Sequence, residues 1–174
     1  MRRLFPGLAF GVLLTSLLLG GCDDNDVCDP GEPCECAGGS DCYLGCDDDG
    51  CDTVCHDMNH CGTVCENDCR SLCFSVDECG TSCGADCNVV CHDAVACGAL
   101  CGERCSFDCR NMGRCGARVG DDSVVVCRQF SRCDIECEGP CRVDCAMANG
   151  CSVTCLGGGG PTQCADGVTA CGGC

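Results

Sequence analysis

The chain has very few large apolar side chains, with no tryptophan, one tyrosine and five phenylalanines among 174 residues. A conventional hydrophobic core is therefore excluded, because too little apolar area would be buried to offset the conformational entropy of the chain. Positive charge is also scarce: there is no lysine, and 10 arginines face 27 aspartates and glutamates, for a net charge of −17. Binding to nucleic acid or to an anionic leaflet by charge alone is not expected.

Cysteine is the residue that the chain has in abundance, with 31 in total. From Cys61 the spacing is C-x3-C-x3-C-x3-C-x5, a period of 18 residues that restarts at every eighteenth position up to Cys151. A fixed period of this size is typical of stacked-repeat proteins. The predicted repeats are 42–60, which is one residue longer than the others, 61–78, 79–96, 97–114, 115–132, 133–150 and 151–170.

The spacing predicts a small, disulfide-rich, all-β fold. All the cysteine intervals are even, and on extended chain even intervals place side chains on one face, so every thiol faces a common interior. We expect a short β-solenoid of about seven 18-residue coils, spaced ~4.8 Å apart. The alternative is an irregular disulfide-knotted domain. Three further columns of apolar or small residues are expected inside: Thr63, Thr81, Ala99, Ala117, Ile135 and Val153; Val89, Phe107, Val125 and Val143; and Met58, Val76, Ala94, Met112, Phe130 and Ala148.

Glycine follows the first cysteine of four consecutive repeats, at Gly62, Gly80, Gly98 and Gly116. We expect these glycines at a repeated corner that needs unusual backbone angles. A helix would also place C-x3-C side chains on one face, but the glycine content and the β-branched residues argue against it.

The first residues indicate export. Arg2 and Arg3 precede an apolar stretch from Leu4 to Leu19, and small residues lead to Cys22. This pattern predicts a helical signal peptide over 1–21. A membrane-spanning helix is not expected, because about 16 apolar residues fall short of the ~20 that a span needs. The tetrad Leu19-Gly20-Gly21-Cys22 resembles the lipobox of bacterial lipoproteins. The resemblance implies cleavage before Cys22, acylation of its thiol and amino group, and membrane attachment through that lipid.

Residues 22–41 are interpreted as a lipid-anchored acidic tether and cap, and 42–174 as the cysteine-rich repeat domain. Lipidation of Cys22 would leave thirty cysteines, enough for fifteen disulfides in an exported protein. The candidates in the regular repeats are Cys61, Cys65, Cys69, Cys73, Cys79, Cys83, Cys87, Cys91, Cys97, Cys101, Cys105, Cys109, Cys115, Cys127, Cys133, Cys137, Cys141 and Cys145.

Repeat 115–132 has Val119 and Ser123 where the second and third cysteines belong. Joint loss of the two middle cysteines favours nested pairing, in which the middle two pair with each other and the outer two do likewise. That pattern predicts Cys65–Cys69 and Cys61–Cys73. Pairing between stacked coils is the alternative, since ~4.8 Å lies within the Cα range of a disulfide.

No catalytic constellation, phosphate loop or cofactor motif is visible, so the chain is not expected to be an enzyme or to hold a cofactor. The C-x-x-C motif at Cys171 and Cys174 is interpreted as a terminal staple rather than a redox site, because no helix follows it. The cysteine content is similar to that of metallothioneins, but these favour C-x-C and C-x-x-C, so no metal site is expected.

Two sets of polar residues are candidates for surface roles. His56 and His92 share a repeat column, two coils apart at ~10 Å, which is too far to share a metal, and with His60 they are expected at the surface. Arginines stack in two columns, and together they form a possible anion patch on an acidic rod: Arg110, Arg114, Arg128 and Arg132.

The signal and the whole repeat array resemble cysteine-rich repeat lipoproteins of bacteria. The resemblance implies a cell-envelope location, on the periplasmic face or at the cell surface, and no specific activity. The predicted function is that of a non-enzymatic, lipid-anchored envelope protein with a structural, protective or adhesive role and an unidentified protein or glycan partner. The alternative is an exported metal- or anion-binding sequestration module.

Overall fold

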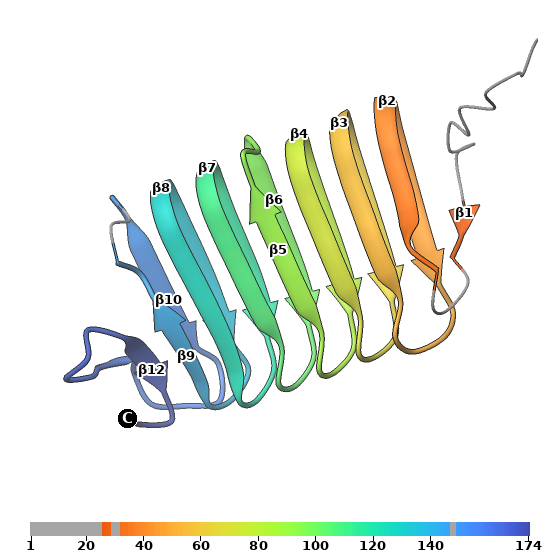
Figure 1. The fold of residues 1–174 in the computed structure, drawn as a ribbon. Helices are drawn as coiled ribbons and strands as arrows, with labels where there is room; N and C mark the ends of the chain where they lie inside the picture. Colours follow the sequence, from red (N-terminus) through yellow and green to blue (C-terminus); the bar gives the residue numbers. More distant parts are fainter. Residues whose placement is uncertain (1–25, 29–31, 147–148) are drawn as a thin grey trace, which may run out of the picture.

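The computed structural model describes residues 26–28, 32–146 and 149–174. The signal peptide and the lipidation candidate Cys22 lie outside the described residues. Part of the expected tether and cap belongs to the solenoid. Its first described segment, β1, pairs in parallel with β2, with Asp26 opposite Leu44, and β2 itself begins at Cys34. Figure 1 shows the strands side by side in a row that follows the order of the sequence.

The described chain is all-β, which confirms the predicted β-solenoid of about seven turns. Within the described ranges no helix is long and apolar enough to cross a membrane. The strands are β1 (Asp26–Val27), β2 (Cys34–Cys46), β3 (Asp52–Cys65), β4 (Arg70–Cys83), β5 (Asn88–His92), β6 (Ala96–Cys101), β7 (Ser106–Val119), β8 (Ser123–Cys137), β9 (Cys141–Asp144), β10 (Cys151–Cys155), β11 (Thr162–Gln163) and β12 (Thr169–Cys171).

Strands of successive coils pair in parallel, and each cysteine of the repeat faces the corresponding cysteine of the next coil. Cys61 pairs in register with Cys79 and Cys73 with Cys91, an offset of 18 residues. Between β2 and β3 the offset is 19, as at Cys42 and Cys61. The extra residue of the first repeat lies in the turn after Cys46, so the register of the strands is preserved.

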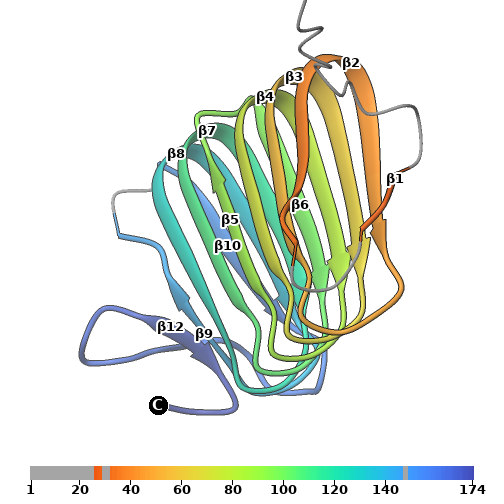
Figure 2. The same cartoon turned by 45° about the vertical axis from the view of Figure 1, so that its right-hand side comes forward.

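Each coil has two faces and two corners, as the turned view in Figure 2 shows. Face 1 comprises residues 70–74 of β4 and their equivalents, and face 2 comprises residues 78–83 and theirs, because β4 pairs with β5 through the former and with β6 through the latter. We call the x5 segment between the faces the first corner, and the segment from face 2 to the next coil, such as 84–87, the second corner.

Both corners use left-handed backbone in non-glycine residues. At the first corner positive φ recurs in one column, for example 56° at Asp57 and 55° at Ser75, and at the second corner it recurs at Asp68 and Asp86, with 56° and 60°. Aspartate and asparagine tolerate this region better than most residues, which explains their recurrence here. The prediction for the repeated glycines is wrong, because Gly62, Gly80, Gly98 and Gly116 have no positive φ and lie within face-2 strands.

The interior is built as the alternation predicts. In β4 the buried residues are Ser71, Cys73, Val76, Cys79 and Thr81, separated by exposed or partly exposed ones. The residues of the three expected apolar columns are buried, except for Val153, which is partly exposed. The side chains of Phe130 and Ala148 lie outside the described part of the structure. Val89, Phe107, Val125 and Val143 are each at most 1% exposed. Most of the buried residues of the described chain are cysteines, so sulfur makes up a large part of the interior.

The C-terminal end is closed by a short hairpin. β12 pairs antiparallel with β9 and with β11, and it is held by the disulfides Cys155–Cys171 and Cys164–Cys174. Both cysteines of the C-x-x-C motif are thus bridged to other residues.

Candidate functional site

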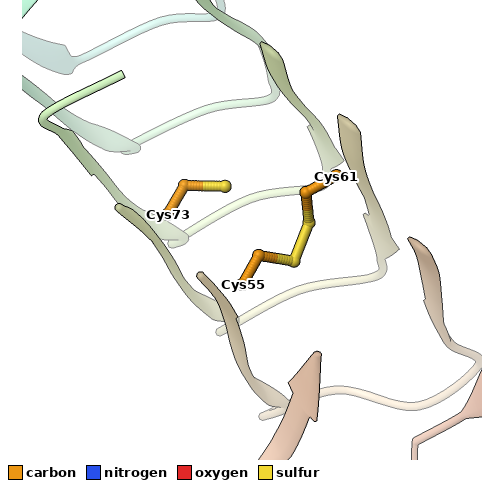
Figure 3. A group of neighbouring side chains, drawn as sticks. All are labelled: Cys55, Cys61 and Cys73. Carbon is orange, nitrogen blue, oxygen red and sulfur yellow. A yellow bond between two sulfur atoms is a disulfide. The ribbon is translucent and has the colours of Figure 1, made fainter. Parts of the chain in front are cut away.

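The first corner is bridged in every coil of the described chain. The fourth cysteine of one repeat pairs with the first cysteine of the next, six residues further on, with Cα–Cα distances of 6.2 to 6.6 Å. Figure 3 shows one such bridge, Cys55–Cys61, with Cys73 of the next coil pointing into the same interior. The first-corner bridges are Cys36–Cys42, Cys55–Cys61, Cys73–Cys79, Cys91–Cys97, Cys109–Cys115, Cys127–Cys133 and Cys145–Cys151.

The predicted Cys61–Cys73 pairing is wrong. Cys61 bonds to Cys55 and Cys73 bonds to Cys79, although the sulfur atoms of Cys55, Cys61 and Cys73 all lie within 4.8 Å of one another. The first corner brings the end of face 1 next to the start of face 2 in the same coil. Cys55 and Cys61 therefore meet within one coil, and their bridge does not have to reach the neighbouring coil. The same result excludes bridges between stacked coils at this corner.

The second corner has a different chemical state in four successive turns. The predicted Cys65–Cys69 bridge is not formed, and eight cysteines of the described chain are unpaired, all of them buried except the partly buried Cys83. They form two columns along the solenoid, which we call the thiol ladder: Cys46, Cys65, Cys83 and Cys101 in one column, and Cys51, Cys69, Cys87 and Cys105 in the other.

Sulfur atoms of the ladder approach one another across coils as well as across corners. The Sγ atoms of Cys83 and Cys101 are 3.0 Å apart. Two triads have all their sulfur atoms within 4.8 Å of one another: Cys65, Cys69 and Cys87 form one, and Cys83, Cys101 and Cys105 form the other. Cys83 and Cys87 flank the same corner but belong to different triads.

The ladder ends at the coil that lacks both middle cysteines. Val119 is fully buried in the first column, and the Ser123 hydroxyl in the second column accepts a hydrogen bond from the Cys105 N–H at 3.1 Å. One coil further on, the same two columns hold the disulfide Cys137–Cys141, with a Cα–Cα distance of 6.0 Å. The predicted bridge between the second and third cysteines is thus formed in this coil, whereas it is absent from the four turns of the thiol ladder.

The thiols of the ladder influence one another's protonation. Burial raises the pKa of Cys69 to about 11. A hydrogen bond with Cys105 lowers the pKa of Cys101 to about 5, while the hydrogen bond with Cys101 raises the pKa of Cys83. The pKa of Cys87 is also lowered, chiefly by a hydrogen bond with Cys105. Two thiols of the ladder therefore favour the thiolate, which is the form that binds metals.

A shallow groove of about 840 Å³ runs along the outside of face 2. Its floor is the column of Gly62, Gly80, Gly98 and Gly116, and exposed Val64 and Leu100 stand along it. The Tyr43 ring covers Gly62, where an added Cβ would lie 2.5 Å from a ring carbon. These glycines, which the sequence pattern placed at a corner, instead leave room for the groove because they have no side chain.

The arginine columns are in the predicted register, Arg110 beside Arg128 and Arg114 beside Arg132. Carboxylates neutralise three of the four: Arg110 pairs with Asp108, Arg128 with Asp144 at 3.2 Å and Arg132 with Asp134 at 2.6 Å. The possible anion patch is therefore interleaved with negative charge.

The histidines of the shared column do not face a common centre, because Phe74 lies between them. Its ring stacks on His56 at 5.0 Å and on His92 at 5.3 Å between ring centroids. His56 also contacts the carboxylates of Glu35 at 2.8 Å and Asp57 at 2.9 Å, which raise its pKa. This is a stacked surface ladder.

No protein-family model, curated protein or solved structure matches the chain. The functional argument therefore depends on the repeat geometry and on the state of the cysteines.

Proposed function

We propose that this protein is a non-enzymatic, lipid-anchored component of a bacterial cell envelope, with a structural, protective or adhesive role as a covalently stapled rod. One observation carries the proposal: each coil has its own disulfide across the first corner. Such a repeated bridge needs an oxidising compartment, as found outside the cytoplasm, and the export signal before Cys22 agrees with this.

The bridges make the rod resistant to local opening. A coil that lacks a large apolar core would otherwise separate from its neighbours, because its interior offers little area for burial. The bridge limits the freedom of the unfolded coil, and the C-terminal hairpin with its two disulfides protects the last strands. Resistance to proteases is the property that these features support best.

The anchor is proposed from the lipobox and from the way the chain enters the fold. β1 lies beside the Tyr43–Gly45 end of the groove on face 2. A lipid on Cys22, a few residues before β1, would hold this end of the rod near the membrane. The groove, which faces outwards along several coils, is the surface for an adhesive contact.

The anchor is tested by expressing the full chain and a Cys22→Ser variant in a bacterial host and separating membranes from soluble material. The intact mass of the wild-type protein should show loss of residues 1–21 and addition of acyl chains, and the variant should leave the membrane fraction. A Cys28→Ser/Cys34→Ser variant is the matched control, because it removes nearby thiols that form a bridge and should remain membrane-bound. Wild-type protein in the soluble fraction with an unmodified Cys22 would refute the anchor.

The protective role is tested separately by digesting the purified protein with a broad-specificity protease. The unreduced protein should stay intact, whereas the reduced and alkylated protein should be degraded. Equal resistance of the two forms would show that the bridges do not confer it.

A further inference from the structure

We propose that the thiol ladder is a binding site for a soft, thiophilic metal ion, and that Cu(I) is the ion that its two sulfur triads match. The triads are Cys65, Cys69 and Cys87, and Cys83, Cys101 and Cys105. Soft thiolate ligands favour Cu(I) and zinc over the hard cations that oxygen ligands hold. The ladder would thus add a binding activity to the stapled rod.

The first argument is distance. In each triad the sulfur atoms lie within 4.8 Å of one another. Two metal–sulfur bonds of ~2.3 Å span ~4.6 Å when they are collinear and less when they are bent. A metal ion between the sulfur atoms of a triad therefore needs only small side-chain adjustments.

The second argument is connectivity. A disulfide gives each sulfur atom one partner, as at the first corner. In the ladder a sulfur atom has several sulfur neighbours, because the Cys83 Sγ lies 3.0 Å from the Cys101 Sγ and within 4.8 Å of the Cys105 Sγ. Cys83 and Cys87, which a bridge across their corner would join, are instead assigned to different triads. This is the arrangement that a thiolate cluster uses, with one metal ion drawing ligands from two coils.

The third argument is the choice of ion. Each triad supplies three sulfur atoms, and structural zinc usually takes four ligands in a tetrahedron. Cu(I) is stable with fewer ligands, so three thiolates satisfy it. Three sulfur triads outside the ladder consist of cysteines already bonded in first-corner disulfides, among them Cys55, Cys61 and Cys73.

The site also has defined ends. Cys46 and Cys51 lie beside the first triad at the N-terminal end, and Val119 with Ser123 stops the columns at the other end. Beyond it Cys137 and Cys141 are bridged to each other and have no thiolate to offer. The expected capacity is therefore about two Cu(I) per chain, one for each triad.

The experiment uses the mature full chain in detergent, purified without oxygen. Copper is added as Cu(I), unbound ion is removed, and the bound metal is counted by elemental analysis, with Zn²⁺ in a parallel sample. The test variant is Cys101→Val/Cys105→Ser, which copies the residues that coil 115–132 carries at the same positions. It should fold, as far-UV circular dichroism will check, and should lose at least half of the bound copper.

The matched control is Cys137→Val/Cys141→Ser, the same substitutions in the same columns at the bridged corner. It should bind as much copper as the wild type. Full copper binding by the Cys101→Val/Cys105→Ser variant, or more zinc than copper on the wild type, would contradict the assignment.

A measurement on the native protein keeps the proposal testable without any variant. Alkylation without reduction, followed by mass spectrometry, should label eight cysteines once copper has been removed with a chelator, and the labels should fall on the ladder. Four additional bridges, Cys46–Cys51, Cys65–Cys69, Cys83–Cys87 and Cys101–Cys105, would overturn the metal site and leave the stapled rod intact. Loss of the anchor would leave the copper result unchanged, so the two proposals fail separately.

Discussion

Both corners carry cysteines, six residues apart at the first corner and four apart at the second corner of the regular repeats, yet the two corners differ in chemistry. At the first corner each sulfur atom has a covalent partner six residues away in the same coil. At the second corner of four successive turns, sulfur atoms of neighbouring coils meet and none is bridged. A column of cysteines in the sequence therefore determines where the sulfur atoms lie, but not whether they form disulfides or remain thiols.

The largest expected effect is the loss of the whole fold when the first corner is opened throughout. Complete reduction and alkylation removes the eleven disulfides of the described residues, and an interior with few large apolar side chains cannot compensate for them. We expect the β signal in far-UV circular dichroism to disappear. A reduced protein that keeps this signal would show that the interior suffices without bridges.

Opening one first corner should have a moderate effect. Replacing Cys91 and Cys97 together by serine removes a bridge that closes a loop of six residues, which in the chain-entropy model is worth about 2 kcal/mol. Urea unfolding of the variant and the wild type measures the difference. A change near zero would mean that neighbouring coils hold this corner closed by themselves.

The matching change at the second corner should cost less, under about 1 kcal/mol in metal-free protein, because large losses need a removed bridge or a cavity. The variant is Cys101→Val/Cys105→Ser, and a serine at 105 would keep the polar contact that the Cys105 thiol makes with the Gly84 carbonyl oxygen at 3.2 Å. If this variant loses as much stability as the first-corner variant, the second corner is bridged and the contrast between the corners is lost.

The left-handed residues allow a comparison of the two turns themselves. Asp68→Val at the second corner should destabilise by about 1 kcal/mol, because a β-branched residue resists a φ of 56°. Asp68→Asn should be nearly neutral. Asp57→Val makes the same change at the first corner, and thermal unfolding of the three variants shows whether the bridge there reduces the cost.

The smallest expected effect concerns pH at the first corner. Hydrogen bonds with Glu35 and Asp57 raise the pKa of His56 above 6.5, so protonated His56 favours the folded state. This contribution is complete below the unfolded pKa of 6.5 and is lost as the pH rises through the higher folded pKa. The wild type should lose slightly more stability than His56→Gln between pH 6 and pH 8 (about the His range), as thermal unfolding will measure. Identical pH dependence of both proteins would contradict this assignment.

Much of the fold was predictable because it follows from local rules. Even spacing on extended chain places cysteines inward, and the columns of Thr63 and Val89 are buried as alternation requires. The positions of the left-handed residues were not predictable from glycine. Aspartates at 57, 68, 86 and 93 adopt these angles, while the repeated glycines lie in extended strands.

The candidate site was predictable only in part. Val119 and Ser123 indicated that the middle cysteines belong together, and the bridge Cys137–Cys141 confirms that their columns meet. The nested pairing of Cys61 with Cys73 failed, because column spacing cannot tell which of two nearby sulfur atoms lies in the same coil and which in the next. The only sequence feature that related to the groove on face 2 was the column of glycines. The sequence did not show whether those positions face the interior or the solvent, so the groove could not be predicted from them.

The amino-acid order alone determined the period, the number of coils and the inward direction of the cysteines, since these depend on the two-residue alternation of extended chain. Only the tertiary structure decided which cysteines are bridged and which remain thiols. That choice depends on which sulfur atoms come close within a coil and which meet between coils, and these distances are set only when the chain has coiled and the coils have stacked.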